Sequence, residues 1–370
     1  MNTLSVEERT ALRESVHRLM NEASSEAAVR STMETDQGYD VDLWRKLSEM
    51  GVTGLIIDEE WGGSGVGPLE LEAVMEEAGA ALLCSPLLAS GVVAAQLLQA
   101  LGDDERCGRL LPEIASGGCI ASAVLTGDSG CWTQQGIGVS ASHSDGQWRL
   151  QGRGNYVLHG QNADVLIVIA ATDDGPAAFE VDPGVSGVTR ESLPTFDKTL
   201  RLAAIEFDQA DAGRIEANAP VWDAVQQALD LGLVALAGEQ AGGAQKVLDF
   251  TVEYAKTRVQ FGRQIGSYQA IKHMAANLLL ETESAVSAAR NAAARLAEGA
   301  ESTAEAVSLA AFACADAFVK TAADGIQMHG GIAFTWEHPA HLYLRRARSG
   351  AQLFGTSAYH RERYLQALGG

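Results

Sequence analysis

The spacing of apolar residues is helical over the first third of the chain. Between about Ser5 and Leu111, apolar residues recur every three or four positions, as in LWRKLSEMG and PLELEAVMEEAG, and glycines follow these runs. This period matches the turn of an α-helix, and glycine commonly ends one. We therefore predict an N-terminal helical domain over residues 1–115, with the glycine-rich GLIIDEEWGGSGVGP as a surface loop.

The pattern changes to that of β-strands between about Gly118 and Ala210. CIASAVLT and VLIVIAAT are short apolar runs, whereas GQWRLQGRGNYVLHG and LRLAAIEFD alternate. Asp145 and Gly146 form a typical hairpin turn pair. Short strands separated by turn residues predict a small β-barrel or sandwich, which we assign to residues 116–215.

From Pro220 onward the chain is rich in Ala and Leu with helical periodicity. We predict four long helices at about 221–257, 267–297, 303–329 and 339–368. Short breaks between helices favour an antiparallel bundle, here residues 216–370. The expected class is α+β multidomain: a helical domain, a middle β domain and a C-terminal four-helix bundle.

Composition limits the possible ligands. The formal net charge of −21 makes non-specific binding to nucleic acid or an anionic membrane unfavourable. A phosphate-bearing ligand must therefore meet local positive charge. The five cysteines are scattered without a CxxC pair, so we expect neither a disulfide framework nor a metal site.

Two stretches of the sequence indicate where in the cell the protein is located. The N-terminal stretch mixes charged and apolar residues and lacks the apolar core of a secretory signal, so we expect a cytoplasmic protein. Residues 78–102 carry no charge over a length that could span a bilayer, but Pro86, Gly91, Gln96 and Gln99 interrupt them. We predict two buried helices broken at Ser85–Pro86 rather than a membrane span.

The stretch RVQFGRQIGSYQAIKH, residues 258–273, places two arginines, an aromatic residue, two glycines and a glutamine between two predicted helices. Guanidinium groups and helix-end backbone groups both favour phosphate, which makes this junction a candidate anion or cofactor seat. A turn with solvated charges would use the same residue types. These residues alone leave both interpretations open.

Three segments resemble the acyl-CoA dehydrogenase family of flavoproteins. They are YAKTRVQFGRQIGSYQAIKH, IQMHGGIAFTWEHPAHLYLRRA and LFGTSAYHR. The chain is most similar to the bacterial group that acts on bulky CoA thioesters, such as sterol side chains, often as mixed two-gene tetramers. The resemblance implies FAD, an acyl-CoA substrate, a homo-oligomer or α2β2 assembly, and electron-transfer flavoprotein or a similar electron acceptor.

The resemblance also implies cofactor contacts, because FAD lies between subunits in that family. One group of positions holds its pyrophosphate and adenine side, a second reaches FAD from a neighbouring subunit, and a threonine follows the catalytic turn. These positions correspond respectively to Arg258, Phe261 and Gln269; to Gln327, Gly330 and Gly331; and to Thr356.

The family's catalytic base is missing from both of its usual places. Family members carry a glutamate before the Gly-Thr pair or near the start of the first bundle helix, where this chain has Phe354 and Gly232. Glu239 is a candidate replacement, because it lies seven residues beyond Gly232. Seven residues are two helical turns, or roughly 10.5 Å, so both positions lie on the same face of the helix. Its alternative role is an ion pair with a nearby helix. Weaker candidates are Asp230, His329, Glu337 and His338.

The β domain departs from the family as well. LTGDSGCW stands where flavin-side members carry a Thr-Glu-Pro-Gly-rich turn. Tyr156 and Leu158 stand where those members carry the Trp and the Thr of a Trp-x-Thr segment. Three functional classes remain open. The chain is a catalytic subunit with a relocated base, a non-catalytic partner that completes the FAD seat of a sister chain, or a flavin-dependent oxygenase on the same fold.

Overall fold

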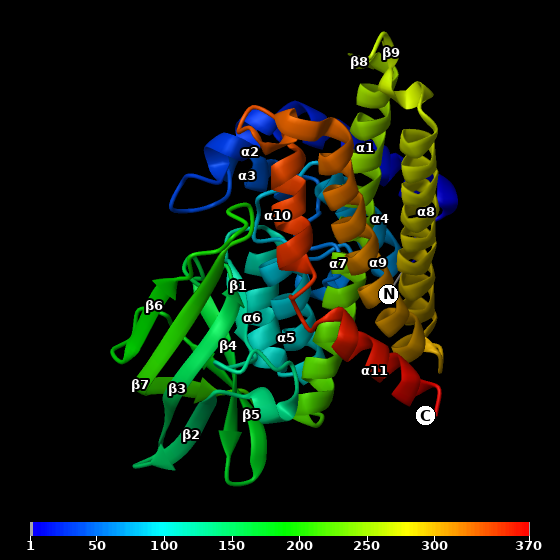
Figure 1. The fold of residues 1–370 in the computed structure, drawn as a ribbon. Coiled ribbons are helices and arrows are strands. Elements are labelled where there is room, and N and C mark those ends of the chain that lie inside the picture. The colour runs from blue at the N-terminus through cyan, green and yellow to red at the C-terminus, as the bar shows by residue number, and fades with distance from the viewer. Residues whose placement is uncertain (1–2, 370) are drawn as a thin grey trace. The chain divides into compact units, whose positions relative to one another are not determined.

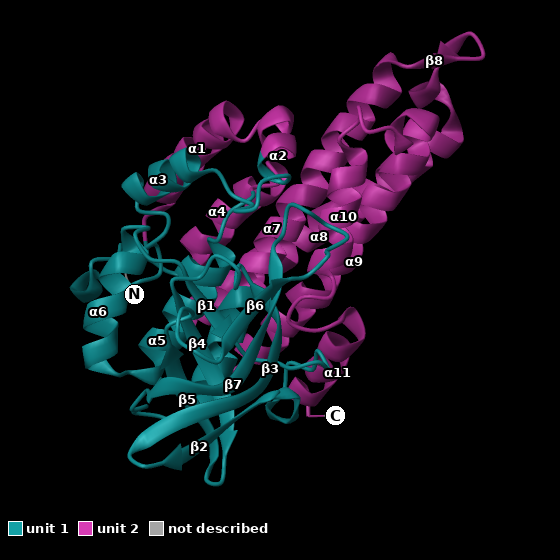
Figure 2. Cartoon of the chain, turned by 90° about the vertical axis from the view of Figure 1, so that its left-hand side faces the viewer, with its two compact units in different colours: residues 1–3, 32–67, 84–232 teal, residues 4–31, 68–83, 233–370 magenta. Residues whose placement is uncertain are grey.

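The structure is a computed structural model that describes residues 3–369. The chain divides into two compact units (Figure 2). Among the described residues, unit 1 contains Thr32–Gly67 and Cys84–Gly232 with Thr3, and unit 2 contains Leu4–Ser31, Pro68–Leu83 and Leu233–Gly369. The predicted order of helices, strands and helices is confirmed, whereas the three-domain division of the sequence stays a prediction.

Unit 1 begins with short helices that carry the sequence signals for their ends. The Asp40 carboxylate accepts hydrogen bonds from the Asp42 and Leu43 amides, and Asp103 accepts one from the Arg106 amide. Side-chain acceptors of this kind satisfy the unpaired amides of a first helical turn. The helices are α3 (Val41–Glu49), the π-helical η2 (Leu88–Ala94), α5 (Ala95–Leu101) and α6 (Asp104–Ala115). The η2 segment and most of α5 are buried.

The strands of unit 1 form a closed barrel, as the sequence predicts. Pairing runs β4–β2–β3–β7–β5 and returns to β4, while β1 pairs with β4 and β6 with β7. Asp145 and Gly146 join β2 to β3 at φ 53° and 77°, the left-handed values that the predicted hairpin turn requires. The strands are β1 (Ala121–Val124), β2 (Val139–Ser144), β3 (Gln147–Leu158), β4 (Val165–Thr172), β5 (Gly175–Val181), β6 (Val188–Ser192) and β7 (Leu202–Arg214).

Long helices make up unit 2, and α8 and α9 lie side by side in it (Figure 1). A short hairpin of β8 (Val259–Gln260) and β9 (Arg263–Gln264) connects α7 to α8. The helices are α1 (Val6–Ala23), α2 (Glu26–Thr32), α4 (Pro68–Ala80), α7 (Val221–Thr257), α8 (Gln269–Glu298), α9 (Thr303–His329), α10 (Ala340–Gly350) and α11 (Ser357–Ala367). The chain boundary between the two units falls inside α7.

The prediction of a single helix over residues 339–368 is wrong. This stretch is divided into α10 and α11 by a turn in which Phe354 and Gly355 have φ values of 61° and 123°. Such backbone angles cannot continue a right-handed helix. The Thr356 hydroxyl then caps α11 by accepting from the Tyr359 amide.

One helical segment of the described chain, Thr303–Phe334, is long and apolar enough to cross a membrane by length and composition. In its most apolar window, 61% is buried within the structure, as in a core helix of a bundle. The uncharged stretch 78–102 forms no long helix, because α4 ends at Ala80 and η2 begins at Leu88.

Glycines bring α4 and α7 into close backbone contact inside unit 2. A Cβ added at Gly79 would lie 1.9 Å from the Glu239 carbonyl oxygen, and one at Gly242 would lie 1.8 Å from that of Glu76. Only glycine fits at such distances. Four carboxylates of α4 are also buried, those of Glu70, Glu72, Glu76 and Glu77.

Arginines compensate three of these carboxylates. Arg9 bonds to Glu70 at 3.0 Å, and Arg13 bonds to Glu76 and Glu77 at 2.6 and 2.7 Å. The Glu72 Oε1 atom, by contrast, has no hydrogen-bond partner in the structure as described for residues 3–369. Burial, and next the negative charge of Glu76, raise the pKa of Glu72 to about 7.

Replacing Glu72 with Gln should stabilise the protein in a pH-dependent way. The folded pKa lies above the usual value of 4.5, so wild-type stability falls as pH rises from 4.5 to about 7 and then levels off. This difference between the usual and the folded pKa of Glu72 corresponds to a loss of roughly 3 kcal/mol at most in the free energy of unfolding. We expect the Glu72→Gln variant to melt at a higher temperature than wild type at pH 8 and at nearly the same temperature at pH 5. Equal differences at both pH values, or the same gain in the exposed control Glu283→Gln, would contradict the assignment.

Candidate cofactor and active site

Two of the segments predicted to bind cofactor are joined in unit 2 by a pair of stacked rings. The Tyr254 and His329 rings have centroids 4.4 Å apart and are nearly parallel. The Tyr254 hydroxyl also donates to the His329 carbonyl oxygen at 3.4 Å. Arg258 lies one helical turn beyond Tyr254, and Gly330 follows His329 directly. The structure therefore brings the arginine segment and the glycine segment to one end of the bundle.

The β8–β9 hairpin presents an aromatic ring to solvent. Its turn residues, Phe261 and Gly262, have φ values of 51° and 79°, and the Phe261 side chain is 92% exposed. A bulky residue with left-handed backbone angles is strained, which costs stability. We therefore interpret the conformation of Phe261 as one kept for function. An exposed phenyl group at a hairpin tip suits contact with a cofactor or a second chain.

The two arginines of this stretch differ in what they already bind. The Arg263 guanidinium lies 3.8 Å from the centre of the Tyr268 ring, a cation–π contact. No hydrogen bond or ion pair engages the exposed Arg258 side chain in the part of the chain that the structure describes, although its carbonyl accepts from the Ile265 amide at 2.8 Å. Arg258 is therefore the arginine available to an anionic ligand.

The glycine segment leaves its backbone open. Gly330 ends α9 with φ 66°, and a Cβ added at Gly330 or Gly331 would meet no atom within 4 Å. Gly330 is thus the C-cap of α9, and this role coexists with an accessible backbone. Gln327 and Gln269 are exposed on the adjoining turns of α9 and α8.

These groups fit an anionic diphosphate. They combine an unengaged guanidinium, side-chain amides and glycine backbone that a ligand can approach closely. Thr356 lies apart from them in the chain, at the start of α11, where its hydroxyl accepts from the Tyr359 amide at 3.3 Å. The assignment of all seven residues to the cofactor stays a prediction.

Neither family position for the base holds a proton acceptor. Phe354 is buried and strained at φ 61°, and Gly232 lies buried within α7. Glu239 is buried too, and its Oε1 atom accepts from Arg346 at 2.9 Å. Arg346 also donates to the Leu83 carbonyl oxygen at 3.0 Å. The ion-pair alternative for Glu239 is thus the arrangement found.

The weaker base candidates are placed as follows. Burial lowers the pKa of His329, and its ring Nδ1 lies 2.8 Å from the Gly325 carbonyl oxygen. Burial and then His329 lower the pKa of His338. Asp230 accepts from the Gln226 amide at 3.2 Å, and Glu337 is exposed. None of these observations marks one of them as the base.

Unit 1 carries the flavin-side positions of the β domain. Tyr156 is 38% exposed near the end of β3 and has φ 56°, whereas Leu158 is buried. The loop that replaces the usual turn touches this tyrosine, because a Cβ at Gly130 would lie 3.2 Å from its ring. Tyr156 remains available to a ligand, whereas the hydroxyl that the family places two residues later is absent.

Sequence reasoning missed a cluster of rings behind the glycine segment. Besides the stacked pair, the Phe250 ring lies 5.5 Å from His329, 5.9 Å from His338 and 5.6 Å from Tyr343. Phe250 and Tyr254 are one turn apart on α7, which was the only signal in the sequence. The histidines and Tyr343 come from segments far along the chain.

Comparison with known proteins assigns the family. The family model described as "Acyl-CoA dehydrogenase, N-terminal domain" matches residues 6–118, and that described as "Acyl-CoA dehydrogenase, C-terminal domain" matches residues 222–369. The acyl-CoA dehydrogenase IpdE2 of Mycobacterium tuberculosis is 37% identical over 348 residues, which are 94% of this chain and 93% of the relative. The chain belongs to the acyl-CoA dehydrogenase family. It is a flavin-dependent oxidoreductase subunit whose cofactor is FAD.

Solved structures of similar proteins share the fold over the whole chain. One is the ChsE4–ChsE5 complex from Mycobacterium tuberculosis, with 28% identity, a TM-score of 0.90, and coverage of 100% of this chain and 99% of the matched chain. Another is the steroid ACAD Tcur3481–Tcur3483, with 26% identity, a TM-score of 0.87 and coverage of 98% of both chains. Both neighbours are named as pairs of chains.

Replacing Arg258 with Ala should lower the FAD content of the purified acyl-CoA dehydrogenase. A diphosphate would lose a charge-assisted contact of the kind worth roughly 1.5–3 kcal/mol, which is about a tenfold or greater loss of affinity. Flavin absorbance per chain at limiting FAD measures the effect. Arg263→Ala is the matched control, because that guanidinium is already engaged by Tyr268. Equal flavin content in wild type and Arg258→Ala would refute the assignment.

Proposed function

We propose that this chain is the subunit without a catalytic base in an α2β2 acyl-CoA dehydrogenase that acts on a bulky, sterol-derived acyl-CoA thioester. The observation that carries the proposal is the buried contact between Glu239 and Arg346 at 2.9 Å. It engages Glu239, the strongest candidate to replace the glutamates absent at Phe354 and Gly232. The site residues that remain free are those suited to hold FAD.

The similar proteins support the assembly and the substrate class. The ChsE4–ChsE5 complex and the steroid ACAD Tcur3481–Tcur3483 each pair two different chains, and each matches this chain over nearly its whole length. The second is named for a steroid. A related sister chain carrying the glutamate would make the present chain's lack of a base harmless.

The reaction needs two groups near the thioester. A base removes the proton from the α carbon while a hydride leaves the β carbon, so that a double bond forms between them. FAD supplies the hydride acceptor when it is bound. In this proposal the Arg258 guanidinium and the backbone at Gly330–Gly331 hold the diphosphate, the sister chain provides the base, and electron-transfer flavoprotein or a similar acceptor reoxidises the flavin.

Replacing Glu239 with Gln tests whether this residue is structural or catalytic. Removing one partner of a buried pair leaves the other charge uncompensated and typically costs about 3–5 kcal/mol. We expect a strongly lowered melting temperature. In the complex with a glutamate-bearing sister chain, the rate of flavin reduction by molecules that remain folded should be unchanged. The double variant Glu239→Leu with Arg346→Met should recover most of the stability, because well-packed apolar residues can replace such a pair.

A large loss of rate in Glu239→Gln at full FAD content would instead establish Glu239 as a relocated base in this chain. The rate should be measured at a temperature where both proteins are folded by circular dichroism. The double variant then separates the two roles, since it restores packing without restoring a proton acceptor.

Co-expression with a sister chain should convert an inactive protein into an active one. Alone, this chain should reduce its flavin with acyl-CoA slowly or not at all, because general-base assistance is commonly worth 10²–10⁴-fold. With a sister chain that carries the family glutamate, we expect one flavin-containing complex of equal subunit ratio and fast anaerobic reduction by a sterol-type acyl-CoA. Native mass spectrometry gives the ratio. Fast reduction by the chain alone, or failure of every glutamate-bearing sister chain to restore it, counts against the proposal.

A further inference from the structure

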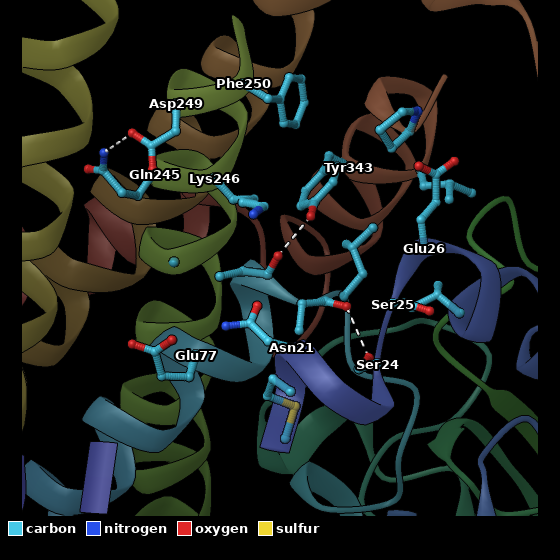
Figure 3. A pocket seen from close by; sticks show the side chains of 18 of the residues that line it. Asn21, Ser24, Ser25, Glu26, Glu77, Gln245, Lys246, Asp249, Phe250 and Tyr343 are labelled. Carbon is cyan, nitrogen blue, oxygen red and sulfur yellow. Dashed lines mark hydrogen bonds between the residues drawn. The ribbon is translucent and has the colours of Figure 1, made fainter. Parts of the chain in front are cut away.

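Unit 2 contains a cavity of about 620 Å³ that the dehydrogenation reaction does not use (Figure 3). Its walls come from α1, α2, α4, α7, α9 and α10. This volume is in the range of cavities that enclose small organic ligands. All of its lining residues belong to unit 2, so the cavity is complete within one compact part of the chain.

The cavity is distinct from the reaction site. Its lining on α7 begins at Gly242 and ends at Tyr254, so it starts ten residues, or about 15 Å of helix, beyond Gly232. The position of the family base before Gly355 contributes nothing to its walls. A thioester carbon that reacts beside either of these two positions would therefore lie outside the cavity.

One wall of the cavity is aromatic. The Phe250 and Tyr343 rings are 5.6 Å apart, and the stacked Tyr254 and His329 rings continue the wall. The Tyr343 hydroxyl donates to the Ala80 carbonyl oxygen at 2.7 Å, which fixes the ring in place. Rigid rings of this kind favour a flat, apolar ligand body.

The acidic groups of the cavity are already engaged. Glu76 and Glu77 bond to Arg13, and Glu26 bonds to Arg30 at 2.7 Å. Asp249 accepts from the Gln245 amide at 2.8 Å. In Figure 3 these two side chains lie bonded to each other on one side of α7, whereas Lys246 and Phe250 extend on the other side, toward Tyr343.

Lys246 is the exception among the charged groups that line the cavity. No hydrogen bond or ion pair joins its ammonium group to any residue in the described range. The exposed Lys246 ammonium group is therefore available to a ligand's anionic group, and the aromatic wall beside it suits a ring system.

We propose that this cavity binds a small ring-bearing carboxylate, with its ring against Phe250 and Tyr343 and its carboxylate on Lys246. The ligand would also touch Tyr254 and His329, the two rings that join the cofactor segments. This site is independent of the proposed substrate and of the missing base. It makes the cavity a place where a carboxylic acid acts on the enzyme without entering the reaction site.

Isothermal titration of the flavin-loaded protein with 2-naphthoate tests the proposal. We expect one saturable site per copy of this chain, and binding at least about tenfold weaker in Lys246→Gln, since hydrogen bonds to charged groups are worth roughly 1.5–3 kcal/mol. Lys256→Gln is the matched control on the same helix, because Lys256 is exposed and paired with Glu253 outside the cavity. The neutral analogue 2-naphthamide should also bind at least about tenfold more weakly to wild type.

Three results overturn the proposal: no saturable binding of 2-naphthoate to wild type, equal affinity in Lys246→Gln, or equal affinity for the acid and the amide. A loss of affinity in Lys256→Gln as large as that in Lys246→Gln does the same, because it would mean attraction to general positive charge. The Lys246 side chain is exposed, so its variant should keep the wild-type melting temperature and flavin content, which confirms that affinity is compared between folded proteins.

Discussion

The close backbone contact between α4 and α7 constrains most of what unit 2 can do. Gly79 faces the Glu239 carbonyl oxygen and Gly242 faces that of Glu76, at distances that exclude any side chain. The four carboxylates of α4 are themselves buried. Charged groups in such a place must be paired, because an uncompensated buried charge is costly. The ion pairs of Arg9 and Arg13 with α4 follow from that requirement.

The same contact decides the role of Glu239. The residue lies in the close-packed stretch of α7, buried, and Arg346 from α10 compensates its charge. A general base must have a carboxylate oxygen free to reach the substrate, whereas the Glu239 carboxylate is already bonded to the Arg346 guanidinium at 2.9 Å. Close packing requires Glu239 to be paired, whereas catalysis would require it to be free. The observed ion pair with Arg346 satisfies the packing requirement. The reaction then needs a proton acceptor from another chain.

Local patterns predicted the parts of the structure that local physics determines. The alternation around Asp145–Gly146 predicted a hairpin, and the 3.6-residue period predicted α7, α8 and α9 almost to their ends. The period failed at 339–368, where Phe354 adopts a left-handed backbone that its side chain disfavours. That conformation is imposed by the surrounding fold. A sequence pattern expresses preferences of the residues, so it could not show this turn.

Contacts between distant segments were beyond the reach of sequence spacing. Glu239 and Arg346 are 107 residues apart, and the rings around Phe250 come from three separate stretches of the chain. The family resemblance identified the cofactor segments by position, but it gave no reason why Arg258 and not Arg263 should be available. The stacking of Arg263 on Tyr268 provides that reason.

The stacked pair of Tyr254 and His329 is the structural link between the cofactor segments and the cavity. Both rings line the cavity; His329 directly precedes Gly330, and Tyr254 lies one helical turn before Arg258. Burial lowers the pKa of His329, which favours the neutral form of its ring. With Nδ1 facing the Gly325 carbonyl oxygen, the neutral ring must carry its proton on that nitrogen. The residue directly before the glycine segment is thus held by a hydrogen bond to Gly325 and by a ring stack with Tyr254.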